Sequence, residues 1–105
     1  MNLFDAGAPT LEEITRVLFE DAHTRIERIT SWGQRSAADF WYDQDEDEWV
    51  SVLAGRATLR LMDANDSTRD VHLAPGDTLL LPAHMRHQIT HTDAPTIWLC
   101  VFSKG

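Results

Sequence analysis

The chain has 105 residues, of which 43% are hydrophobic and 25% are charged, with five Gly, four Pro and one Cys. This composition is typical of a single globular domain and excludes a disordered chain, a collagen and a disulfide scaffold. Nine basic and 17 acidic residues leave a formal net charge of −8, which repels phosphate backbones and anionic lipids. Because no apolar run reaches the roughly 20 residues of a membrane span, and no basic secretory start is present, we expect a cytoplasmic protein without nucleic-acid or membrane partners.

The N-terminal segment, residues 1–22, carries a helix signal. Thr10 and Glu13 have the spacing of a capping box, in which each side chain bonds to a free backbone N–H of the first turn. Three apolar residues recur at helical spacing, namely Leu11, Ile14 and Leu18. We therefore predict a helix over residues 11–20.

The remainder, residues 23–105, is predicted to be a β domain. Short β-rich runs are separated by turn sequences such as Pro75-Gly76-Asp77, and the absence of helical segments between them favours a sandwich or barrel over a parallel sheet. The predicted strands are His23–Ser31, Ala38–Tyr42, Glu48–Ala54, Ala57–Asp63, Asp70–Leu73, Thr78–Leu81, His87–His91 and Thr96–Ser103. The single Cys100 falls in the last of them and is interpreted as a small buried apolar residue.

Two polar clusters interrupt the β pattern, at residues 41–49 and 82–91. Glu48 opens a strand whose alternate residues are apolar, so its side chain is predicted to point inward with them. His87 and His91 are four residues apart, so a regular strand would place both on one side. The structural alternative is that Glu48 lies on a solvated rim and His87 is a hydrogen-bonded core residue.

The spacing of these residues resembles the cupin family of small β-barrels. The first cupin motif is H-x-H, three or four residues, E, six residues and G, and Glu48 with Gly55 fits its second half. The second motif is G, five residues, P-x-G, two residues, H, three residues and N. It is matched by Gly76, Pro82, His84 in place of the glycine, His87, and His91 in place of the asparagine.

The resemblance extends from about Ile26 to Phe102 and includes the stretches Phe40–Gln44, Glu48–Val50 and Pro82–His87, which are similar to those of small single-domain cupins. It implies an all-β double-stranded β-helix, the cupin jelly-roll barrel. The predicted N-terminal helix would precede this barrel.

The chain departs from the family where the two histidines of the first motif should stand. Depending on the gap, their places hold Tyr42 and Gln44 or Trp41 and Asp43. The motif ligands that carry over are Glu48 and His87, and the further candidate ligands are Gln44, Asp43 and His91. Such a mixed oxygen and nitrogen set suits Zn, Mn, Ni or Fe(II) without choosing among them.

The resemblance implies a divalent metal in the barrel and a small polar metabolite as substrate or ligand, without defining a reaction. In the absence of a metal, Glu48 and His87 are the candidate catalytic residues as a general acid/base pair. Two alternatives stay open: a metal-free binding module for a small molecule, and a structural protein without catalysis. We also expect a homodimer, with residues 23–31 or the N-terminal segment at the contact, since a short chain and open strand edges both gain from pairing.

Overall fold

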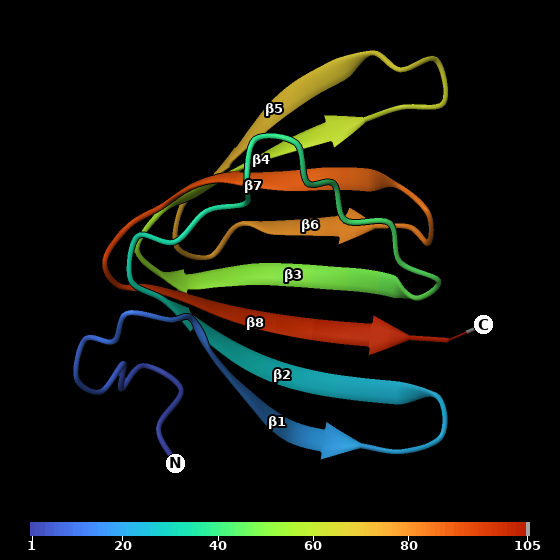
Figure 1. Ribbon diagram of the computed structural model, residues 1–105. Helices are drawn as coiled ribbons and strands as arrows, with labels where there is room; N and C mark the ends of the chain where they lie inside the picture. Colours follow the sequence, from blue (N-terminus) through green and yellow to red (C-terminus); the bar gives the residue numbers. More distant parts are fainter. Residues whose placement is uncertain (105) are drawn as a thin grey trace.

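The computed structural model describes residues 1–104, which form two antiparallel sheets (Figure 1). A five-stranded sheet has the order β1-β2-β8-β3-β6, and a three-stranded sheet has the order β5-β4-β7. This all-β architecture confirms the expected fold class; Gly105, the last residue of the predicted β domain, lies outside the described residues. The strands are β1 (Ile14–Glu20), β2 (Thr24–Ser31), β3 (Asp47–Ala54), β4 (Ala57–Met62), β5 (Thr68–Leu73), β6 (Thr78–Leu81), β7 (Arg86–Thr92) and β8 (Thr96–Ser103).

The predicted helix over residues 11–20 is wrong, because most of that segment is strand β1. It pairs antiparallel with β2, from Ile14 opposite Thr30 to Glu20 opposite Arg25. Pairing along a whole strand edge outweighs a helix signal made of one cap and three apolar residues. Across residues 1–104 the structure contains no helix, and so none that could cross a membrane.

The segment between β2 and β3 also differs from the prediction. Residues 38–42 do not form a strand; they belong to a long loop that runs along β7 (Figure 1). Only Tyr42 is bridged to a strand, by backbone hydrogen bonds in both directions with His87. The loop therefore closes one side of the barrel without extending a sheet.

The hydrophobic core lies between the two sheets and is built by strict alternation. Val50 and Val52 of β3 face Leu59 and Leu61 of β4, and all four are at least 97% buried. Since successive strand residues point to opposite faces, β3 and β4 contribute alternate side chains to this core, whereas β1 is exposed along its length and contributes none.

Gly55, in the turn between β3 and β4, has a conformation that other residues rarely adopt. Its φ is +73°, and a Cβ added there would lie 2.3 Å from the carbonyl oxygen of Pro95. The turn therefore requires glycine, both for its positive φ and for the close approach of another backbone. This is a structural reason for the glycine that ends the first motif.

Candidate functional site

A small cavity inside the barrel is lined by two of the five candidate residues, Glu48 and His87. It has a volume of about 30 Å³, and β3, β7 and β8 are among the strands that line it. Its lining is mainly apolar, with polar groups from Glu13, Glu48, His87 and Cys100. Glu48 and His87, which are 39 positions apart in the chain, therefore converge on one cavity, as predicted from their inward orientation.

Glu48 is held in apolar surroundings at the start of β3. It is 7% exposed, and its neighbours across the strands are Leu81 and Phe102. Burial raises the pKa of its carboxyl from 4.5 to about 7, although a hydrogen bond with the Cys100 thiol lowers it. At neutral pH this carboxyl is therefore divided between its protonated and ionised forms, which is the range where a proton donor or acceptor works best.

His87 lies on β7 and is 4% exposed. Its Nδ1 is 3.1 Å from the carbonyl oxygen of Met85. A carbonyl only accepts, so Nδ1 carries the proton and Nε2 keeps a lone pair in the neutral ring. Burial lowers the pKa of His87, so the ring is neutral at pH 7. Tyr42 stacks on this ring with 5.0 Å between ring centroids and covers one of its faces.

Gln44 lies beside Glu48. Its Nε2 is 3.5 Å from Oε1 of Glu48, and its backbone oxygen accepts a hydrogen bond from the N–H of His84. Gln44 therefore lies within reach of the buried carboxylate. It is the one further metal candidate that the structure brings next to Glu48.

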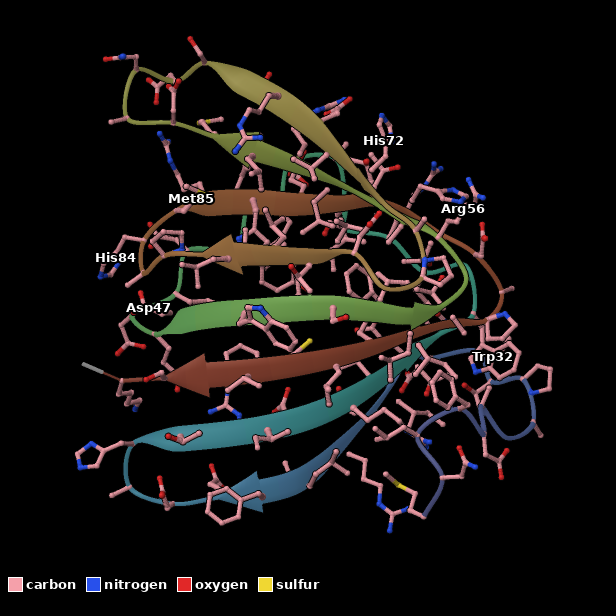
Figure 2. All side chains as sticks on the ribbon, turned by 180° about the vertical axis from the view of Figure 1, so that it is seen from behind. Trp32, Asp47, Arg56, His72, His84 and Met85 are labelled. Atoms are coloured by element: carbon pink, nitrogen blue, oxygen red, sulfur yellow. The ribbon has the colours of Figure 1, made fainter. Side chains whose placement is uncertain are left out.

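Asp43 is adjacent in sequence but points away from the cavity. Its carboxylate is 2.8 Å from Nδ1 of His84, and the two side chains are 53% and 70% exposed. Figure 2 shows His84 projecting outward from the turn between β6 and β7. Asp43 and His84 therefore form a surface pair at the barrel rim, and the structure does not bring Asp43 together with Glu48.

His91 lies on the outer side of β7 rather than beside His87. The pairing of β4 with β7 is regular up to Ile89 opposite Leu59 and then shifts, so that His91 opposes Thr58 and Thr90 is left over. Such a β-bulge reverses the alternation, which places residues four apart on opposite faces. His91 is exposed and contacts Asp93 with its Nε2 2.8 Å from the carboxylate, so it does not reach the cavity.

Two residues of the cavity were not predicted to be functional. Glu13, interpreted from the sequence as a helix cap, lines the mouth of the cavity, where its Oε2 accepts a 2.5 Å hydrogen bond from the hydroxyl of Ser31. Ser31 in turn accepts a hydrogen bond from the indole of Trp98. Cys100 is indeed buried, but its thiol contacts Glu48, and burial raises its pKa well above the usual value. The one sequence signal for Cys100 was its alternation with Trp98 and Phe102.

A divalent metal with a complete set of protein ligands does not fit this arrangement. Within residues 1–104, no three His, Cys, Asp or Glu side chains lie close enough together to hold an ion. The donors at hand are the Glu48 carboxylate, Nε2 of His87 and the Gln44 amide. Only Glu48 and His87 among these donors are of the His, Cys, Asp and Glu types, one fewer than the three protein ligands of a catalytic metal site, so these donors would hold an ion weakly.

Comparisons with known proteins agree with this fold. The sequence pattern described as "Cupin domain" matches residues 32–102. A crystal structure from Ralstonia eutropha JMP134, of a protein named as a proposed mannose-6-phosphate isomerase, is 41% identical, with a TM-score of 0.88 over 100% of this chain and 97% of that chain. No protein with a curated description matches this chain.

Two more distant structures share the fold. A cupin superfamily protein from Desulfitobacterium hafniense DCB-2 is 19% identical, with a TM-score of 0.78 over 94% of this chain and 84% of that chain. A double-stranded β-helix protein from Klebsiella pneumoniae is 18% identical, with a TM-score of 0.75 over 100% of this chain and 89% of its own. On the family pattern and the identity to the Ralstonia protein, this chain belongs to the cupin domain family.

Proposed function

We propose that the barrel binds a small, uncharged polar metabolite and that Glu48 and His87 act on it as a general acid/base pair. The observation that carries this proposal is the pairing, in one cavity, of a carboxyl with a pKa of about 7 and a neutral imidazole with a free Nε2. Groups tuned toward neutrality by burial are typical of catalytic sites. The protonated carboxyl would donate to a substrate oxygen, and Nε2 would accept a proton.

The size and charge of the cavity restrict the ligand. A volume of about 30 Å³ admits only a small group, so a larger molecule would extend into the adjoining pocket of about 80 Å³. The two spaces share Glu13 and Ile89. Because no Lys or Arg lines the inner cavity and two carboxyls do, an anionic group is disfavoured there.

A sugar isomerisation is a specific candidate reaction, suggested by the name of the Ralstonia relative. Moving a proton between two carbons of an aldose and a ketose needs one group that removes the carbon-bound proton and one that protonates the carbonyl oxygen. His87 and Glu48 would fill these roles. A 6-phosphate would have to lie outside the inner cavity, where Arg35 in the adjoining pocket offers a cation.

The test follows proton exchange in D₂O by proton NMR, with mannose and mannose-6-phosphate as separate substrates. Loss of the C2 proton signal with the wild-type protein, but not with Glu48→Gln or His87→Gln, would support the acid/base pair. The control is Asp45→Asn, which neutralises an exposed carboxylate of the same acidic stretch. Binding of a sugar without exchange would instead indicate a binding module. If the protein shows no binding and no exchange, the sugar is not its ligand.

Divalent metal binding is the second candidate, favoured by the convergence of Glu48, His87 and Gln44 and by the family to which the chain belongs. Metal content would be measured by mass spectrometry on protein purified without chelator or affinity tag. A stoichiometric metal that is lost in both Glu48→Ala and His87→Ala would support it. A trace of metal that neither variant changes would contradict it.

A further inference from the structure

The outer face of the five-stranded sheet carries a continuous apolar row, which we call the outer stripe. The five strands lie side by side in the order β1-β2-β8-β3-β6 (Figure 1). The strand register aligns the members of the stripe across them. Leu80 opposes Trp49, Trp49 opposes Val101, Val101 opposes Ile26, and Ile26 opposes Phe19. The stripe therefore consists of Leu80, Trp49, Val101, Ile26 and Phe19.

The stripe is open to solvent in the single chain. Leu80 is 57% exposed, Phe19 is 52% exposed and Trp49 is 37% exposed. Their sequence neighbours Leu81 and Glu48 point the other way and are buried in the barrel, so the exposure is not a consequence of a loosely packed sheet. A contiguous apolar row of this kind typically marks a surface that another protein covers.

The charges around the stripe distinguish this face from the rest of the molecule. The chain has 17 acidic residues, but among the outward positions of these five strands only Asp47 is acidic. The row next to the stripe contains Arg16 and Arg28 and no carboxylate; its other members are Leu99, Ser51 and Thr78. A copy of this acidic protein could approach here with the least charge repulsion.

We propose that the outer stripe is a homodimer interface in which β8 of one copy lies against β8 of a second copy, around a two-fold axis close to Val101. Because β8 is the middle strand of five, this axis exchanges β2 with β3 and β1 with β6. Ile26 then meets Trp49 of the second copy, and Phe19 meets Leu80. In the next row, Arg16 meets Thr78, so no like charges face each other there. Arg28 donates hydrogen bonds to the backbone oxygens of Asn2 and Asp5, so the N-terminal segment borders the interface at this point.

The area of the face is sufficient for such a dimer. Five strands at about 4.8 Å spacing and eight residues at about 3.3 Å give a face of at most roughly 600 Å² per copy. Two copies would cover about 1,200 Å² in total, at the lower end of specific interfaces. A dimer of modest affinity is therefore expected, with Trp49 as its main contributor.

The experiment is sedimentation equilibrium of the full chain over a range of concentrations. We expect a dimer that Leu80→Lys and Trp49→Glu weaken by at least about 30-fold in dissociation constant. Phe40→Lys is the matched control, since Phe40 is 48% exposed but lies in the loop along β7, outside the five-stranded sheet. A wild-type monomer at high micromolar concentration, or a dimer that Leu80→Lys and Trp49→Glu leave unchanged, would overturn the proposal.

A symmetric cross-link tests the axis without disturbing the apolar surface. Val101→Cys places the thiol of residue 101 next to the same thiol of the second copy. Mild oxidation should therefore link the dimer through residue 101. Thr78→Cys, which lies two strands away from β8 and faces Arg16 of the second copy, should link much less. Equal linking at both positions would contradict the axis, as would efficient linking at Thr78→Cys alone. The interface is independent of the acid/base proposal, because variants of the stripe leave the cavity residues in place.

Discussion

Two carboxyl and imidazole pairs, only a few residues apart in the chain, have very different environments. Asp43 and His84 are in contact at the barrel rim with their side chains more than half exposed, whereas Glu48 and His87 share a cavity and are 7% and 4% exposed. Water screens the first pair, so its exposed contact adds little stability. Burial raises the pKa of Glu48 and lowers that of His87. The same residue types therefore have different environments because the fold removes water from only one of the two pairs.

The largest difference between the pairs is expected in ligand turnover or binding. His87→Gln removes the Nε2 lone pair that we propose as the proton acceptor, and we expect a loss of about 100-fold or more in proton exchange, as is usual for a general base. His84→Gln should leave the exchange rate within about twofold of the wild type, since its side chain is outside the cavity. Exchange rates measured by NMR on both variants would decide between the two pairs, and an equal loss in both would refute the distinction.

Glu48 should also make stability depend on pH. Its pKa is raised from 4.5 to about 7, so between these values the folded protein retains a proton that the unfolded chain releases. Stability from this group is therefore complete below about pH 4.5 and is lost as the pH rises toward 7. The whole effect is on the order of 3 kcal/mol.

Glu48→Gln keeps the shape and removes the charge. We expect it to be more stable than the wild type at pH 8, by up to about 3 kcal/mol, and to lose most of that advantage at pH 5. Urea unfolding of both proteins at pH 8 and pH 5 would measure how the difference in their free energies of unfolding changes with pH. Titration of the other groups cancels in this comparison. Asp43→Asn is the control, and a parallel change in both variants would show that burial of Glu48 is not the cause.

A smaller effect is expected from the ring that covers His87. Tyr42 stacks on the imidazole and contacts Phe40 edge-on at 4.9 Å. Tyr42→Leu should destabilise the fold by about 1 kcal/mol through the lost aromatic contacts, while the backbone bridge to His87 is retained. It should also let water reach the ring and shift the pKa of His87 upward, toward its ordinary value. NMR titration of His87 would measure this shift; an unchanged titration would mean that Tyr42 does not exclude water.

The smallest effect concerns the surface pair itself. Replacing Asp43 by Asn removes one charge from an exposed contact, for which we expect a change below about 1 kcal/mol. Added salt should reduce even that difference. Thermal unfolding at low and high salt would measure it, and a larger loss would indicate that this pair supports the turn at residue 84.

Much of the fold and part of the site could be predicted from the sequence. Seven of the eight strands lie where alternating apolar runs were bounded by turns, since alternation is a local property of residues two apart. Glu48 and His87 were found because a polar residue at an inward strand position needs an explanation. Gln44 was placed near Glu48 by its position in the first motif, and the structure has it there.

The errors share a physical origin. The segment over residues 11–20 has an apolar spacing compatible with a helix, and only the neighbouring edge of β2 makes it a strand. His91 was placed beside His87 because the alternation of a regular strand was assumed, but a bulge against β4 reverses it. Glu13 was assigned to a helix cap, and its contact with Ser31 depends on β1 pairing with β2. Each of these depends on a partner strand that is distant in sequence.

The order of residues along this chain was sufficient to predict a β domain over residues 23–105, its family and two of the side chains that line its cavity, because each follows from local alternation or motif spacing. The tertiary structure decided which carboxyls and imidazoles lose water, where the strand alternation reverses, and which apolar row stays uncovered. These properties arise between strands, and the free energy of burial depends on what the rest of the molecule places around a residue.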